Sequence, residues 1–205
     1  MGRPVPPALT WLIRHGQSAA NAGLPTSGYG EVPLTPLGQQ QAREVADRIA
    51  RQPDLLITSA FLRARETAEP IRARWPQTRC ETWPIQELTY LSPARCRGTT
   101  VESRQPWVED YWRRSDPDYR DGPDAESFRS FVSRLSDFHW RLLALDDGFV
   151  VVVGHGQFFR AYQLARGDNF AVSPEWMKKY RAAETAWPMA NGEIVAITGE
   201  ALCRA

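Results

Sequence analysis

Two stretches that lie far apart in the chain each place a histidine and a glycine at the end of an apolar run. Arg14, His15 and Gly16 follow the first run, and His155 and Gly156 follow the second. A neutral imidazole can attack phosphorus and become a phosphohistidine, and arginine forks match phosphate oxygens. We therefore predict phosphoryl chemistry in which one histidine is the nucleophile and the other stays protonated beside the phosphoryl group.

The elements that must position these residues follow an alternating hydrophobic pattern, which favours an α/β fold of three α/β/α layers with a mainly parallel central sheet. Strands are predicted over residues 9–13, 55–58, 79–83 and 149–153, and helices over 36–51, 60–74, 127–145 and 157–165. The final predicted element is a β-hairpin, with strands 186–189 and 193–198 on either side of the turn signal Asn191-Gly192.

Ligands of open α/β sheets bind beyond the carboxyl ends of the strands, so polar residues at those ends are expected to converge. The first strand ends in Arg14 and His15, the second in Ser59, and the polyvaline strand in His155. Arg63 comes one turn into the helix that follows Ser59. Two histidines and two arginines that are scattered in the sequence are therefore predicted to form one phosphate pocket.

Several neighbouring residues are predicted to complete this pocket. Gly16 and Gly156 would let backbone amides approach a ligand closely, and a helix that begins near Gln157 would direct its positive end at a phosphate. Gln17 and Asn21 are expected either to bind phosphate or to orient the loop.

The reaction also needs a proton for the leaving oxygen, which a carboxylic acid with a raised pKa supplies. Glu81, Glu87 and Glu102 are the candidates around the third strand and the segment after it. Glu87 is preferred because it comes soon after that strand, where a loop would reach the same edge of the sheet.

Residues 84–124 differ from the rest of the chain, since they are rich in proline and contain the aromatic cluster Trp107, Tyr111 and Trp112. We predict a single domain over 1–205 in which this segment is a lid-like insertion with one short helix over the active site. For these aromatic side chains, a role in the core of that helix is favoured over a role as a platform for the substrate.

Composition excludes several classes of protein. The net charge of +1 argues against a general nucleic-acid binder, and the 3 cysteines form neither a zinc spacing nor a disulfide framework. The longest apolar run is far too short to span a membrane, and no signal peptide is recognised. We expect a cytoplasmic protein without metal or cofactor that acts on a small phosphorylated metabolite, and a structural or solvent-facing role for His139.

The chain resembles the histidine phosphatase superfamily, which includes the cofactor-dependent phosphoglycerate mutases. Four elements occur in family order: Arg14-His15-Gly16-Gln17-Ser18 with Asn21; Pro33-Leu34-Thr35 with Gly38 and Gln41-Ala42; Ser59 with Arg63-Ala64 and Thr67-Ala68; and Gly154-His155-Gly156. The resemblance implies a histidine acid-type phosphatase that hydrolyses a phosphomonoester without a metal. It implies that His15 is phosphorylated, that Arg14, Arg63 and His155 hold the phosphate, and that a glutamate, assigned to Glu87, donates the proton.

The sequence also departs from the family. Glu87 leads into Leu88-Thr89-Tyr90-Leu91, where many members have a Gly-x-Trp-Glu-Gly-like stretch. The chain is shorter than typical mutases and its insertion is different, which favours hydrolysis. A phosphoglycerate-mutase-type phosphomutase and a non-catalytic phospholigand-binding protein remain the alternatives, and specificity is expected to lie in residues 84–124.

Overall fold

A five-stranded, mostly parallel sheet forms the centre of the computed structural model, which describes residues 6–26, 28–146 and 148–203. The strands are β1 (Leu9–Arg14), β2 (Leu55–Ser59), β3 (Arg79–Trp83), β4 (Phe149–Gly154) and β5 (Ile194–Thr198). Their order across the sheet is β3-β2-β4-β1-β5, and β5 alone runs antiparallel to its neighbour. The predicted mainly parallel sheet is confirmed.

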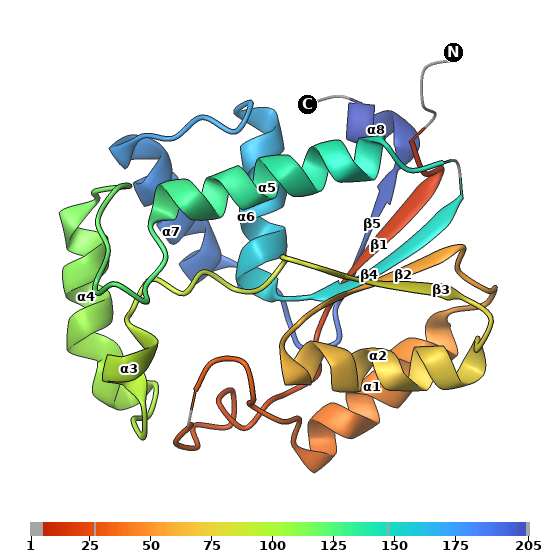
Figure 1. The fold of residues 1–205 in the computed structure, drawn as a ribbon, viewed down its shortest axis with the longest axis horizontal. Helices are drawn as coiled ribbons and strands as arrows, with labels where there is room; N and C mark the ends of the chain where they lie inside the picture. Colours follow the sequence, from red (N-terminus) through yellow and green to blue (C-terminus); the bar gives the residue numbers. More distant parts are fainter. Residues whose placement is uncertain (1–5, 27, 147, 204–205) are drawn as a thin grey trace.

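Helices cover both faces of this sheet, as Figure 1 shows, so the three-layer α/β/α architecture is confirmed as well. One face carries α1 (Pro36–Arg48) and α2 (Leu62–Arg74), and the other carries α5 (Phe128–Leu143) and α6 (Gly156–Gly167). α1 begins where the sequence predicts, because the Thr35 side chain accepts a hydrogen bond from the Gly38 backbone and a proline fills the first helical position.

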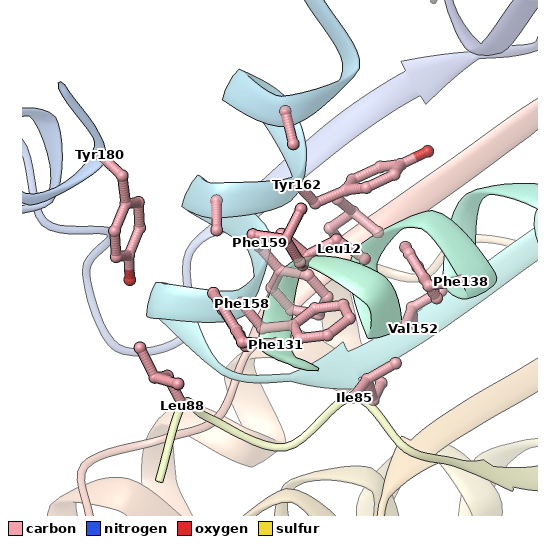
Figure 2. Packing of buried hydrophobic residues seen from close by; sticks show 14 of the residues in the cluster. Leu12, Ile85, Leu88, Phe131, Phe138, Val152, Phe158, Phe159, Tyr162 and Tyr180 are labelled. Carbon is pink, nitrogen blue, oxygen red and sulfur yellow. The ribbon is translucent and has the colours of Figure 1, made fainter. Parts of the chain in front are cut away.

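Two hydrophobic cores result, one on each face of the sheet. Side chains alternate along each strand, so Leu12, Ile57 and Val152 pack with α5 and α6, while Ile13 and Val153 pack with α1 and α2. Figure 2 shows the first of these cores, where aromatic side chains from α5 and α6 meet the sheet. Burial on both faces explains why the central strands are continuous apolar runs.

The segment 84–124 contains more helix than predicted. It folds into α3 (Pro93–Cys96), the 3₁₀ turn η1 (Glu102–Arg104) and α4 (Gln105–Arg114). Tyr111 is 1% exposed, and its ring centroid lies 5.2 Å from that of Trp112 and 4.6 Å from that of Tyr90. The Trp112 ring also packs against Tyr180 of α7 (Pro174–Ala186), with 5.9 Å between the ring centroids. This aromatic packing fastens the segment to the rest of the molecule.

The predicted C-terminal hairpin is wrong, because residues 186–189 form no strand. Ala186 is the last residue of α7, a helix that the sequence analysis missed although Ser173 caps it and Pro174 opens it. The Asn191-Gly192 turn does form, with Gly192 at a φ of 74°, and it leads into β5. β5 then pairs antiparallel with β1 and forms one edge of the main sheet. A short helix, α8 (Gly199–Cys203), follows it.

Sheet register brings three strand ends together. Arg14 is aligned with Gly154 on β4, and Thr58 on β2 is aligned with Val153. The residues that follow, His15, Ser59 and His155, therefore leave adjacent strands at the same edge of the sheet. None of the helices in the described part of the chain is both long and apolar enough to cross a bilayer.

Candidate active site

His15 follows β1 directly and is held as a neutral imidazole with a defined tautomer. Its Nδ1 lies 2.7 Å from the Gly16 carbonyl oxygen, which can only accept, so Nδ1 carries the hydrogen and Nε2 the lone pair. Arg63 Nε donates to that Nε2 at 3.1 Å. Burial, followed by the charge of Arg63, lowers the pKa of His15 to about 3. The nucleophile predicted from the sequence is thus unprotonated at neutral pH.

Arg63 connects the parts of the site from the first turn of α2. Besides His15, its guanidinium donates to the Tyr29 carbonyl oxygen at 2.7 Å and to Glu87 Oε2 at 3.1 Å. The side chain is 7% exposed, and burial lowers the pKa of Arg63 while Glu87 opposes that shift. Because an arginine keeps its charge even in such a setting, a phosphate here meets a fixed cation.

Glu87 lies in the loop after β3, with Oε2 3.9 Å from His155 Nδ1. Burial favours its neutral form, but the charges of Arg63 and Arg14 outweigh this and hold the pKa of Glu87 below its ordinary value. The predicted raised pKa is therefore wrong for the site without a phosphate. The carboxylate is ionised because two arginines share its surroundings.

The other two candidate acids lie outside the site. Glu81 on β3 accepts hydrogen bonds from the Trp83 indole at 2.7 Å and from the neighbouring Arg79. Glu102 is an exposed residue of η1. Neither lines the cavity described below, whereas Glu87 does.

His155 is the N-cap residue of α6 and is completely buried. Its ring centroid is 5.1 Å from that of His15, and its Nε2 lies 2.9 Å from Ser59 Oγ. Ser59 Oγ also accepts from the Phe61 backbone at 3.3 Å, so its own hydrogen can go to Nε2, which leaves Nδ1 to carry the ring hydrogen. That Nδ1 has no partner in the described structure and faces Glu87.

The second histidine is not protonated in this site, contrary to the sequence prediction. Burial first, and then the charges of Arg63 and Arg14, hold the pKa of His155 well below its ordinary value. A neutral His155 still offers an Nδ1–H to a phosphate oxygen, and a bound phosphate dianion would favour its protonation.

Arg14 reaches from the end of β1 to the Met189 carbonyl oxygen through Nη1, and its buried Nε has no partner in the described structure. A Cβ on Gly156 would lie 3.0 Å from Arg14 Cδ, so this glycine makes room for the arginine. A Cβ on Gly16 would lie 2.3 Å from the Gly38 carbonyl oxygen. The prediction that Gly16 makes room for the ligand is wrong, since it makes room for α1.

The remaining predicted binding residues divide between the ligand side and the scaffold. Gln17 Oε1 accepts from Thr35 Oγ1 at 2.8 Å, so the side chain joins the loop to α1 and does not line the cavity. Asn21 lines the cavity, and its Oδ1 accepts from Asn191 Nδ2 at 3.2 Å. Gln157, in the first turn of α6, also lines it with a buried, unpartnered Oε1.

A cavity of about 300 Å³ lies beside the two arginines and Glu87. Its polar end is lined by Arg14, Arg63, Glu87, Gly156 and Gln157. Gly156 and Gln157 are the first residues of α6, so the N-terminus of this helix lies at the cavity, and helix N-termini favour anions. A volume at the small end of ligand pockets suits a phosphate joined to one compact group.

The site also contains one potential metal cluster among the described residues, because ligand atoms of His15, Glu87 and His155 lie within 4.8 Å of one another. Arg63, however, donates to both the Nε2 of His15 and the carboxylate of Glu87, which occupies lone pairs that a metal would need. The charges of Arg63 and Arg14 would repel a cation. The donor set therefore fits an anion better than a cation.

Sequence reasoning missed several groups that position the site. Thr67 Oγ1 accepts from the Gly16 backbone at 3.1 Å, and Asn191 Nδ2 donates to the His15 carbonyl at 3.0 Å. The carbonyls of Tyr29 and Met189 fix the two arginines. Thr67 could have been found in the third sequence element, but a backbone carbonyl carries no signal in its side chain.

Comparison with known proteins agrees with this geometry. The family model of the histidine phosphatase superfamily (branch 1) matches residues 10–171. The chain is 32% identical over 151 residues to a probable phosphoglycerate mutase GpmB of Serratia proteamaculans, covering 71% of this chain and 68% of that protein. It is 29% identical over 183 residues to an adenosylcobalamin/alpha-ribazole phosphatase of Salmonella typhi, and the match covers 86% of this chain and 87% of that protein.

Solved structures share the fold. A mycobacterial glucosyl-3-phosphoglycerate phosphatase has a TM-score of 0.70 at 23% identity, over 93% of this chain and 91% of that one. The chain belongs to the histidine phosphatase superfamily, which confirms the resemblance seen in its motifs. The family model is that of branch 1, so the acid-type label of the prediction, which belongs to a different subfamily, is not retained.

Proposed function

We propose that the protein is a phosphatase that hydrolyses a small phosphomonoester through a phosphohistidine at His15. One observation carries this proposal: a neutral imidazole whose lone-pair nitrogen lies beside Arg63 and near Glu87, two residues that line the cavity. The relatives named phosphatases and mutases support phosphoryl transfer as the chemistry.

In the first half-reaction, Arg14, Arg63 and His155 hold the phosphate oxygens while His15 Nε2 attacks phosphorus. The P–N bond forms as the P–O bond to the alcohol breaks. Glu87 gives its proton to the leaving oxygen. Glu87 is ionised beforehand, so the proton arrives with the substrate, whose second phosphate pKa of about 6 leaves part of it as a monoanion near neutrality.

In the second half-reaction, water attacks the phosphorus of phospho-His15 and Glu87 takes the proton of that water. The P–N bond breaks, its electron pair returns to Nε2, and inorganic phosphate leaves. A phosphomutase would instead deliver the phosphoryl group to a second alcohol. The 32% identity to a probable phosphoglycerate mutase keeps this alternative in consideration, and the assay below separates the two.

The test is to trap the intermediate. Protein is mixed with a ³²P-labelled phosphomonoester and quenched in alkali, and the bound label is then tested for loss in acid. We expect label on the natural sequence and on His139→Gln, and none on His15→Ala.

His139 is a matched control, because it is also a buried histidine but bonds Tyr162 on α6, outside the cavity lining. Label that persists in a folded His15→Ala variant would refute the proposal. Release of inorganic phosphate without an added acceptor is expected for a phosphatase, and its absence would favour the mutase.

A further inference from the structure

The cavity has two unlike ends, and its outer end identifies a class of substrate. We propose that the alcohol part of the substrate is an apolar, ring-sized group and not one that carries a second anionic group. This inference rests on the proposed phosphatase function and specifies what the same site accepts.

Part of the cavity lining is aliphatic. Leu88 and Leu91, from the loop after β3, line it together with Val101 and Val108 from the insertion. Val101 is 54% exposed although it lines the cavity, so its side chain is accessible to an entering ligand. Such side chains offer no hydrogen bond to a carboxylate or phosphate, and a charged group placed against them would lose hydration without compensation.

Arg104 also lines the cavity, but its Nε and Nη2 donors are already used inside the protein. Nε donates to Thr99 Oγ1 at 2.6 Å, and Nη2 donates to the carbonyls of Cys96 and Thr99 and to Thr26 Oγ1. The residue is 9% exposed. Arg104 therefore joins the insertion to the loop at Thr26, which leaves only Nη1 for an anion.

Arg160 is the other arginine of the outer cavity among the described residues, and it shares its wall with a carboxylate. Its Nη2 donates to the Trp187 carbonyl at 2.7 Å and its buried Nε has no partner in the described structure, while Glu184 of α7 lines the same cavity and bonds Arg181 at 3.2 Å. An anionic group near Arg160 would also face Glu184. This wall suits a neutral group better than a second anion.

Size limits the alcohol part further. The whole cavity measures about 300 Å³, and the phosphate occupies the end near Arg14 and Arg63. The remaining space matches one ring and its linker.

The test compares the kcat/KM of three primary alkyl phosphates: phenethyl phosphate, ethyl phosphate and 3-phosphoglycerate. All three release a primary or similar alkoxide, so the demand for a proton is nearly constant. Burying a phenyl ring is worth about 1.5–3 kcal/mol, so phenethyl phosphate should exceed ethyl phosphate by about 10- to 100-fold. 3-Phosphoglycerate should be no better than ethyl phosphate.

Val101→Lys then tests the wall itself. Its position is half exposed, so the fold should survive, and the ratio of 3-phosphoglycerate to phenethyl phosphate turnover should rise about 2- to 5-fold. Leu37→Lys is the matched control, since Leu37 is 48% exposed on α1 outside the cavity lining, and its ratio should not change.

Two results would overturn the proposal: ethyl phosphate or 3-phosphoglycerate turned over as well as phenethyl phosphate, or an equal response to the two lysine substitutions. Failure of the underlying function has a different signature. In that case none of the three esters is hydrolysed and no acid-labile label forms on His15.

Discussion

Replacement of Glu87 by glutamine should separate proton donation from phosphate binding. The substitution keeps the shape of the side chain and an oxygen for Arg63, whose Nη2 lies 3.1 Å from Oε2 in the natural protein. It removes the proton that the leaving alcohol needs. It also removes a negative charge beside Arg63, so the affinity for phosphate should be unchanged or higher.

The magnitude depends on the leaving group. General acid catalysis contributes about 10²–10⁴ in rate, or roughly 3–5 kcal/mol of transition-state stabilisation. An alkoxide needs all of this help, whereas a nitrophenolate is already a stable anion. We therefore expect Glu87→Gln to lower kcat/KM for phenethyl phosphate about 10²–10⁴-fold, and for p-nitrophenyl phosphate about tenfold or less.

The assay is steady-state release of phosphate for both esters, with thermal unfolding to verify the fold. Glu184→Gln is the control inside the cavity, because Glu184 also lines it but bonds Arg181. Glu81→Gln is the control outside it. Equal losses for the aryl and alkyl esters, or a larger alkyl-specific loss in Glu184→Gln, would refute the role of Glu87.

Two further predictions concern the histidines. Ser59→Ala removes the hydroxyl that lies 2.9 Å from His155 Nε2. We expect kcat/KM to fall about 3- to 10-fold, the effect of losing one neutral hydrogen bond. An unchanged kcat/KM would show that Ser59 does not set the tautomer of His155. Burial and the charge of Arg166 lower the pKa of His139 to about 4, below the unfolded value of about 6.5. Between pH 6.5 and pH 4 the unfolded chain therefore binds more protons than the folded protein, and the free energy of unfolding falls as the pH drops. Urea unfolding at pH 7.5 and pH 5 measures how much unfolding free energy is lost on acidification, and this loss should be about 2 kcal/mol smaller in His139→Gln than in the natural sequence. Identical losses would contradict the lowered pKa of His139.

Sequence reasoning succeeded where local pattern and function coincide. The apolar strand runs mark the sheet because both of its faces are covered, and a parallel sheet places its carboxyl ends at one edge. His15, Ser59 and His155 could therefore be placed together before the strand order was known. Arg63 followed from its position one turn into the next helix.

The features that could not be predicted depend on contacts between distant segments. The turn at Asn191-Gly192 was recognised, but only the sheet shows that β5 pairs with β1 and that the preceding segment is the end of α7. In the same way, Gly16 looks like a ligand-approach glycine in the sequence, whereas it is Gly38 of α1 that lies against it. A local motif identifies such a residue without identifying its partner.

The protonation states of the site also follow from one shared group. Arg63 donates to both His15 and Glu87, so its charge lowers the pKa of the nucleophile and also that of the acid. Without phosphate, His15 is therefore unprotonated with its Nε2 accepting from Arg63, and Glu87 is ionised and has no proton to donate. An ester bound as the monoanion brings a proton, and its charge beside Arg63 raises the pKa of Glu87 so that the carboxylate can take that proton. Substrate binding thus couples the charge of the ester to protonation of Glu87, which makes the substrate itself the switch between the two states.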